Sequence, residues 1–469
     1  MKRIIILIAA ALTMTSCGIY KSYTRPDDIR TDQLYGVDYQ STDTASIADI
    51  RWQEMFTDPR LQTLIGRGLE NNTDMQSAYW RVEEARAALQ SARLAFLPSF
   101  NLAPNGGVSS FDGSKGAWSY TIPLAASWQI DIFGGLRNAK RKAKALYAQS
   151  QEYRQAVRTQ LISGIATYYY TLLMLDSQFD ATKQTAESLS ESARIMRDMK
   201  QAGMTTEAGV AQIEAAAYSA HASLQDLEHR IREVENAFCS LLGEVPHDIE
   251  RGTLDEQILP QSLAAGVPLQ LLSNRPDVKS AELALEQAFY TTAAARSALY
   301  PSLTLSGTLG WTNNAGSMIV NPGKLLLSAA GSLAMPLFNA RLNRNQLKIA
   351  KARQEEAKLS FQQTLLNAGA EVNNALSLCQ TARAKAEWRT KQIAALESAY
   401  EATQLLMRHS STTYLEVLTA QQNLLAGRIS QISDRYEEIQ GTIDLYQALG
   451  GGRDTEVEAE TKTDSKKKR

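Results

Sequence analysis

The residue with the clearest chemistry is Cys17, near the N-terminus. It follows MKRIIILIAAALTMTS, in which a positively charged start precedes a short apolar core over residues 4–12. This pattern predicts an export signal over residues 1–16. The small residues before Cys17 are typical of a bacterial lipobox, whose thiol is acylated and becomes the mature N-terminus. Gly18, where an aspartate would retain the protein, favours sorting to the outer membrane. An ordinary secretory signal with an incidental cysteine is the alternative.

Groups of residues that could perform catalysis or bind a metal do not occur in the sequence. It has no CxxC pair, no GxSxG, no HExxH and no phosphate-binding glycine loop. The remaining histidines and cysteines are far apart along the chain: His221, His229, His247, His409, Cys239 and Cys379. We therefore expect no enzyme activity, no metal site and no cofactor apart from the lipid on Cys17. Cys239 and Cys379 are expected to be either paired with each other or buried as free thiols.

Several segments alternate between apolar and polar side chains. Residues 118–131, WSYTIPLAASWQID, do so almost without exception. A period of two predicts a strand with one apolar and one polar face. Strands are predicted over about 99–111, 118–131, 302–312 and 324–337. Trp118, Trp128 and Trp311 lie near strand ends, which is typical of aromatic side chains at a membrane interface.

Long helices are predicted after each pair of strands. Residues 136–200 and 340–408 contain no proline, and about 65 helical residues reach roughly 100 Å. Each helix turns and returns, over 205–242 and 413–449, with small apolar residues at the spacing of coiled-coil packing. Gly134 and Gly135 fit the kink where the strand becomes the helix.

The chain consists of two similar halves. Residues 74–100 match residues 277–303 at a constant offset, so that Pro98 corresponds to Pro301. Each half has a helix (58–94 or 276–298), two strands and a long helical hairpin. The predicted divisions are the signal 1–16, an N-terminal segment 17–57, a first repeat 58–242, a linker 243–275, a second repeat 276–449 and a disordered charged tail 450–469.

Two-faced strands in a mainly helical chain suggest a membrane sheet. Four strands cannot close a barrel, and an open sheet in lipid leaves backbone groups without partners. Three copies of the chain would supply 12 strands and a water-filled bore. The alternative from these residues is a small soluble sheet at the end of a coiled coil. The net charge of −1 gives no reason to expect a nucleic-acid partner.

Three motifs resemble the TolC family of outer-membrane efflux proteins, in its OprM-like lipoprotein branch that serves RND (resistance-nodulation-division) pumps. They are RWQEMFTDPRLQTLI (51–65), SWQIDIFGGLRNA (127–139) and SNRPDVKSAELAL (273–285), in the order of the family. The resemblance covers nearly the whole mature chain. It implies a homotrimer with a 12-stranded outer-membrane β-barrel and a 12-helix periplasmic tunnel. It also implies a periplasmic adaptor protein and an inner-membrane RND pump as partners, with the chain as a passive exit duct anchored by the lipid on Cys17.

The resemblance places a periplasmic gate near the second hairpin tip. Glu416, in YLEVLTAQ (414–421), falls on an acidic position of the family, and Thr419 falls where a second acid often lies. Three copies of Glu416 around one axis would attract cations, and Arg408 would hold the closed state by pairing across a helix interface. The alternative for Glu416 is an ordinary acid at a helix start.

The turns of the hairpins are the predicted adaptor contacts. They comprise Ala202, Gly203, Met204 and Thr205 in the first hairpin and Ser410, Ser411 and Thr412 in the second. Gly203 suits the left-handed conformation of a tight turn, and the alternative is that these are loop residues only.

Two other functions stay open at this point. One is an outer-membrane channel for a type I secretion or ABC-type exporter, and the other is a pore-free structural coiled-coil lipoprotein. No cluster of Met, Cys or His singles out a metal cargo, so drugs, bile salts and metals are all compatible with the sequence.

Overall fold

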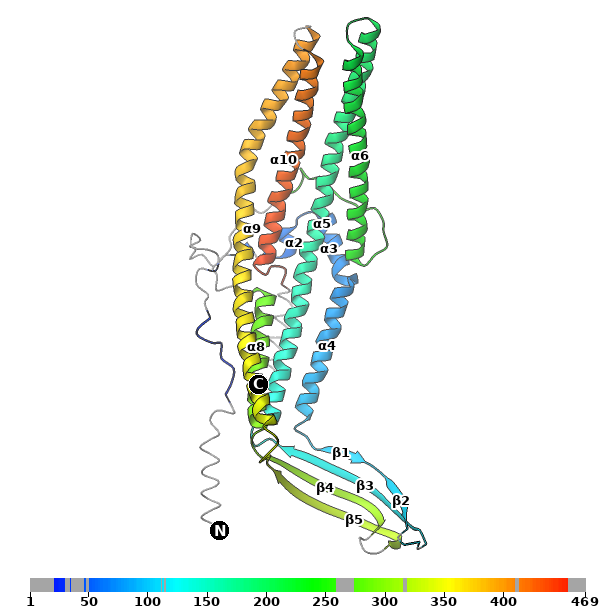
Figure 1. Cartoon of the computed structure of the whole chain (residues 1–469), viewed down its shortest axis with the longest axis vertical. Coiled ribbons are helices and arrows are strands. Elements are labelled where there is room, and N and C mark those ends of the chain that lie inside the picture. Colours follow the sequence, from blue (N-terminus) through cyan, green and yellow to red (C-terminus); the bar gives the residue numbers. More distant parts are fainter. Residues whose placement is uncertain are drawn as a thin grey trace. The chain divides into compact units, whose positions relative to one another are not determined.

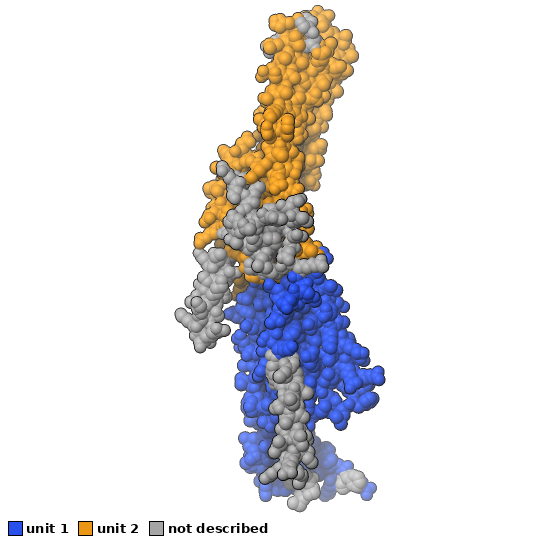
Figure 2. Space-filling model, turned by 90° about the vertical axis from the view of Figure 1, so that its left-hand side faces the viewer, with its two compact units in different colours: residues 1–30, 80–152, 280–363 blue, residues 31–79, 153–279, 364–469 orange. Residues whose placement is uncertain are grey.

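The structure is a computed structural model that describes residues 21–29, 34, 46–47, 50–110, 112–113, 115–258, 274–314, 319–409 and 413–453. The predicted signal, Cys17, the second-tip residues Ser410, Ser411 and Thr412, and residues 454–469 lie outside the described residues. The described chain is mainly helical with one antiparallel sheet, as predicted (Figure 1). It divides into two compact units (Figure 2): unit 1 has residues 1–30, 80–152 and 280–363, and unit 2 has residues 31–79, 153–279 and 364–469.

Helices occur in both units and make up most of unit 2. In chain order they are α2 (Trp52–Met55), α3 (Pro59–Asn71), α4 (Thr73–Leu94), α5 (Gly135–Gln201), α6 (Glu207–Leu242), α8 (Pro276–Ser297), α9 (Leu342–Arg408) and α10 (Tyr414–Ala448). The long helices form because residues 135–201 and 342–408 contain no proline and few glycines. Within the described ranges, no helix is both long enough and apolar enough to cross a membrane.

The predicted single helix over 58–94 is wrong, because α3 and α4 are separate helices. Asn72 lies between them with an extended ψ of 129°. Its side-chain oxygen accepts from the Met75 N–H at 2.9 Å, and its amide donates to the Leu241 carbonyl at 2.8 Å. The side chain of Asn72 thus ends α3, begins α4 and joins them to α6.

Among the described residues, the sheet of unit 1 has five strands: β1 (Ser99–Leu102), β2 (Asn105–Ser109), β3 (Ala117–Ile130), β4 (Ser302–Asn314) and β5 (Ile319–Ala334). Their order is β1-β3-β4-β5, and β2 also pairs with β3 (Figure 1). The prediction of one strand over 99–111 is wrong, because the strand is interrupted at Ala103 and Pro104. Proline has no N–H to donate to a ladder, and β1 and β2 resume the same register against β3 on either side of it.

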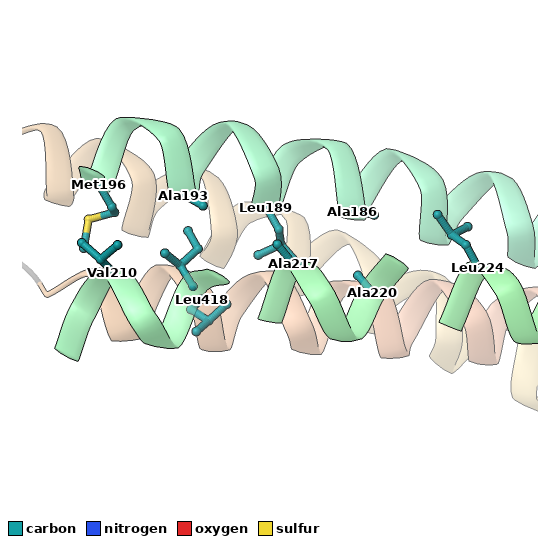
Figure 3. Packing of buried hydrophobic residues seen from close by; sticks show 10 residues of the cluster. Ala186, Leu189, Ala193, Met196, Val210, Ala217, Ala220, Leu224 and Leu418 are labelled. Atoms are coloured by element: carbon teal, nitrogen blue, oxygen red, sulfur yellow. The ribbon is translucent and has the colours of Figure 1, made fainter. Parts of the chain in front are cut away.

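The two helical hairpins of unit 2 are α5 with α6 and α9 with α10. Near the turn of the first hairpin, small and branched side chains three and four residues apart pack between α5 and α6, and Leu418 of α10 joins them (Figure 3). The cluster comprises Ala186, Leu189, Ala193, Met196, Val210, Ile213, Ala217, Ala220, Leu224 and Leu418. This spacing is the coiled-coil pattern that was read from the sequence.

Both hairpins end in the same arrangement. Gly243 follows α6 with φ 74°, and a β-carbon there would lie 2.8 Å from the Asn71 carbonyl oxygen. Gly450 follows α10 with φ 83°, and a β-carbon there would lie 2.6 Å from the Asn274 carbonyl oxygen. Only glycine fits at either position, because the conformation is left-handed and another backbone approaches closely.

The described chain continues to residue 453, beyond residue 450 where the predicted tail starts. Gly451 and Gly452 are buried, and the Gly452 N–H donates to the Tyr446 hydroxyl at 2.8 Å. Thr159 on α5 donates to the Gly451 carbonyl at 2.9 Å.

Candidate functional site

The sheet has one apolar and one polar face, as the alternation predicted. Directly paired residues lie on the same face of an antiparallel sheet. On one face Trp128 pairs with Leu305, Leu124 with Leu309, and Leu309 with Leu327. On the other face Ser127 pairs with Ser306, Gln129 with Thr304, and Thr308 with Ser328. The apolar side chains are exposed, so this face has no covering element in the described chain.

The three predicted interface tryptophans all lie on the apolar face. Trp118 is 73% exposed, Trp128 41% and Trp311 46%. Trp118 pairs with Val108 and Trp311 with Ile122. The Trp128 indole N–H donates to the Phe96 carbonyl at 2.9 Å, which fixes the ring where β3 approaches the end of α4.

The sheet has two unpaired edges. Among the described strands, β1 and β2 pair only with β3, and β5 pairs only with β4. A row of free N–H and C=O groups is a template for a strand from another chain. With 16 residues, β5 offers a long edge for such pairing.

The predicted corner at Gly134 and Gly135 lies where β3 leads into α5. Gly134 has φ 73°, and the carboxylate of Asp131 accepts from the Leu136 and Arg137 N–H groups at 3.1 and 2.8 Å. The corresponding corner before α9 has Ala340 and Arg341 at φ 49° and 64°. Non-glycine residues rarely adopt this conformation, and the sequence analysis did not single it out.

At the first hairpin tip, Gly203 has φ 73°, the left-handed conformation that the turn was predicted to need. Its N–H donates to the Lys200 carbonyl, and the Met204 N–H donates to the Met199 carbonyl, both at 2.9 Å. These two bonds form a Schellman motif. Ala202 and Met204 are exposed, and Thr205 is half-buried.

The predicted gate residues lie around the start of α10. Glu416 is exposed in its first turn. Thr419 is also exposed, and its hydroxyl donates to the Leu415 carbonyl at 2.8 Å. Arg408 is the last residue of α9, and its side chain lies outside what the structure describes. Cys239 and Cys379 are buried free thiols.

Sequence reasoning missed a polar cluster around the loop that follows α6. Arg251 forms two hydrogen bonds with Asp176 of α5 at 2.5 and 3.0 Å, and one with Glu235 of α6 at 2.5 Å. Burial lowers the pKa of Arg251, but the hydrogen bonds and charges of the two acids more than offset this and raise it above its ordinary value. The only signal in the sequence is an arginine in a Gly- and Pro-bearing linker.

A second part of this cluster surrounds Asp58, the N-cap of α3. Its carboxylate accepts from the Tyr169 hydroxyl at 2.5 Å and from the Gln257 amide at 3.1 Å. Burial raises the pKa of Asp58, and the hydrogen bonds from Tyr169, the Arg60 N–H and Gln257 outweigh it, so the pKa falls below its usual value. The loop is thereby joined to α3 and α5.

The two hairpins also contact each other. The hydroxyls of Thr171 on α5 and Tyr436 on α10 are 2.9 Å apart, and Gln178 donates to Ser433 at 3.3 Å. Beside these contacts lies a cavity of about 750 Å³ that is lined by α5, α9, α10 and residues 252–255. Asp434, which accepts from Arg389 at 2.7 Å, lies on its wall.

A two-faced sheet joined in sequence to long helical hairpins defines a class of membrane channel proteins. A family model described as "Outer membrane efflux protein" matches residues 64–244 and 267–451, and the chain belongs to this family. The resemblance to TolC-like channels is confirmed. The chain is an outer-membrane exit duct for efflux that extends into the periplasm.

Similar proteins cover almost the whole chain. The cation efflux system protein CusC of Escherichia coli O6:H1 is 28% identical over 447 residues, which is 94% of this chain and 97% of CusC. The toluene efflux pump outer membrane protein TtgC of Pseudomonas putida is 27% identical over 470 residues, 96% of each protein. A solved CusC structure matches with a TM-score of 0.81 and 27% identity over 92% of this chain and 99% of that one.

Proposed function

We propose that three copies of the chain form one channel with a 12-stranded barrel and a 12-helix tunnel. The observation that carries this is the open, two-faced sheet with unpaired edges at β1/β2 and β5. Edge N–H and C=O groups in lipid cost several kcal/mol each when unsatisfied. Pairing β5 of one copy with β1 and β2 of the next removes both edges, and the polar face then lines water.

Tandem duplication supports this arrangement, because it supplies two equivalent sheet-and-hairpin units per chain. Helices α4 and α8 begin at Thr73 and Pro276, and α5 and α9 each have 67 residues. The Asn72 amide donates to the Leu241 carbonyl as Arg275 donates to the Ala448 carbonyl. The family model also matches the chain twice. We assign residues 58–242 and 276–449 as the repeats and 243–275 as the linker between them.

The exit duct works with a periplasmic adaptor and an inner-membrane RND pump, and the lipid on Cys17 anchors it. The adaptor contacts the hairpin tips, residues 202–205 and 410–412. The chain itself does not select the cargo, since relatives of similar identity are named for cations and for toluene. A photo-crosslinker at Ser411, in the cell of origin, should capture an adaptor. Capture of neighbouring copies alone would argue against the tip as the adaptor contact.

The oligomer is tested by the mass of the purified, lipidated protein in detergent, together with its conductance in a planar bilayer. We expect a conducting trimer. A monomer without conductance would overturn the shared barrel and favour a pore-free lipoprotein.

Glu416 forms a cation-attracting ring at the gate of the trimer. Glu416→Gln should lower the cation selectivity of single channels, because it removes three negative charges around one axis. Glu207→Gln is the matched control, since Glu207 lies in the first turn of α6 and pairs with Lys200. Unchanged selectivity in Glu416→Gln would refute the ring.

A further inference from the structure

Unit 1 carries a concentration of positive charge that its duct role does not explain. Residues 80–152 and 280–363 contain 17 lysines and arginines and nine acids, although the whole chain has a net charge of −1. No acid occurs over residues 132–151 or over residues 287–354. The cations gather in the first turns of α5 and α9, which follow the ends of β3 and β5.

The cations form one stripe on each helix. At about 100° per residue, Arg137, Lys140, Arg141 and Lys144 lie within about 100° of one another around α5. The same arithmetic places Arg344, Lys348 and Lys351 within about 60° of one another around the start of α9, and Arg341 directly precedes this helix. Lys142 and Arg353 lie outside these stripes, about 140° from Arg137 and about 180° from Arg344. We call the two stripes together with Arg341, eight residues in all, the basic collar.

Contacts place the α5 stripe on the side of the apolar sheet face. The Lys140 ammonium lies 5.7 Å from the centre of the Phe96 ring. The carbonyl of Phe96 accepts the indole N–H of Trp128, which lies on the apolar face. Arg141 donates to the Lys21 carbonyl at 3.2 Å, so the α5 stripe also meets the N-terminal segment that follows Cys17.

The α9 stripe lies on the side of the same N-terminal segment. Lys358 is about 20° from Lys351 around α9, and its ammonium donates to Asp28. Arg25 in this segment binds Glu282 of α8 through two hydrogen bonds at 2.8 and 2.6 Å. The described residues of this segment thus contact α5, α8 and α9 near both stripes.

The collar does not serve the stability of the helices. A cation in the first turn of a helix, such as Arg137 or Arg344, opposes the helix dipole and is unfavourable by some tenths of a kcal/mol. Arg341, Arg344, Lys348 and Lys351 are exposed, and none of them forms an ion pair with a carboxylate in the described chain. Leu337 and Phe338, just before the α9 stripe, are both 89% exposed. Exposed apolar side chains beside long cations are typical of a membrane–water interface.

We propose that the basic collar binds the phosphate head groups of anionic lipids in the leaflet where the strands end. This inference rests on the proposed membrane position of the sheet. The lipid tails then cover Leu337, Phe338 and the apolar face, and the head groups meet the cations one turn further along α5 and α9. Each cation near an anionic surface strengthens association by roughly fivefold.

The test uses the full-length, lipidated protein in detergent and native mass spectrometry, which reports oligomeric state and bound lipid together. The probe is dioctanoyl phosphatidylglycerol, with dioctanoyl phosphatidylcholine and inorganic phosphate as comparisons. Lys140→Gln/Arg344→Gln should weaken phosphatidylglycerol binding by about ten- to thirtyfold. The control Lys142→Gln/Arg353→Gln removes the same charge outside the stripes and should change it by less than about threefold. Lys140→Arg/Arg344→Lys should bind as the wild type does.

Three results would overturn the proposal: equal binding of phosphatidylcholine, equal losses in the two charge-removing variants, or displacement of the lipid by equimolar inorganic phosphate, which would indicate a site for free anions. The same preparation also tests the proposed function, because its oligomeric state and its conductance are measured independently of lipid binding. A conducting trimer without preference for phosphatidylglycerol refutes the collar alone, whereas a non-conducting monomer refutes both.

Discussion

Arg251 should be the residue on which the loop after α6 depends most. Its guanidinium binds Asp176 and Glu235, and the side chains of Arg251, Glu235 and Asp176 are 16%, 10% and 34% exposed. Arg251→Met keeps much of the side-chain volume and removes the charge. Glu235 is then left nearly buried without its cation, whereas Asp176 can still be reached by water.

The magnitude follows from these exposures. Removing one partner of a buried pair costs about 3–5 kcal/mol, and a pair that is one-third exposed adds no more than about 1 kcal/mol. Because Glu235 keeps some access to water, we expect the lower end, about 3 kcal/mol. This corresponds to a roughly hundredfold increase in the equilibrium constant for local opening of the loop.

Amide hydrogen exchange of residues 249–257 in the full-length protein measures that opening. Arg251→Met should exchange about a hundredfold faster there than the wild type. The double variant Arg251→Met/Glu235→Gln should exchange about tenfold more slowly than Arg251→Met, because no buried charge is left unpaired. Exchange in Arg251→Met within threefold of the wild type, or no recovery in the double variant, would refute the reasoning.

Three further changes test separate features. Gly243→Ala should lower the free energy of unfolding by about 2 kcal/mol or more, because the new β-carbon would meet the Asn71 carbonyl. Gly203→Ala should cost about 1 kcal/mol, because Gly203 shares the left-handed conformation but has open space around it. Equal losses in thermal unfolding would contradict the close approach at Gly243. Burial raises the pKa of Asp444 above its ordinary value. The ionised carboxylate therefore lowers the stability of the folded state above that raised pKa, and this loss disappears as the pH falls through it. Asp444→Asn should therefore raise the Tm at pH 8 by more than at a pH below 3.8, the ordinary pKa of an aspartate, and a constant difference would be evidence against this. Tyr436→Phe removes the hydroxyl contact between α10 and α5, worth about 1 kcal/mol, and should raise the open-to-closed ratio of single channels up to about fivefold; an unchanged ratio would show that this contact does not hold the hairpins.

Patterns that are local in the chain were readable from the sequence. The alternation over 118–131 predicted β3 to within a residue, and the proline-free stretches predicted α5 and α9 to within two residues at each end. Gly203 was expected in a left-handed turn and has φ 73°. The motifs over 51–65, 127–139 and 273–285 identified the family that the comparisons confirm.

Errors arose where one or two residues interrupt a pattern that continues on both sides. Ala103 and Pro104 divide a strand whose alternation is otherwise intact, and Asn72 divides a helix whose apolar spacing is otherwise intact. The Asn72 side chain caps α4 by accepting from the nearby Met75 N–H, and it also donates to the carbonyl of Leu241, which is 169 residues away in sequence. Its local sequence contains no sign of that partner.

The sequence by itself determined most of the helices and strands and the family, because periodicity and turn chemistry are properties of neighbouring residues. Only the tertiary structure decided which polar groups meet. Arg251 lies 75 residues from Asp176, and Gln257 lies 199 residues from Asp58. Such pairs form because burial penalises any polar group that lacks a partner, and which partner is near depends on how α3, α5 and α6 pack together.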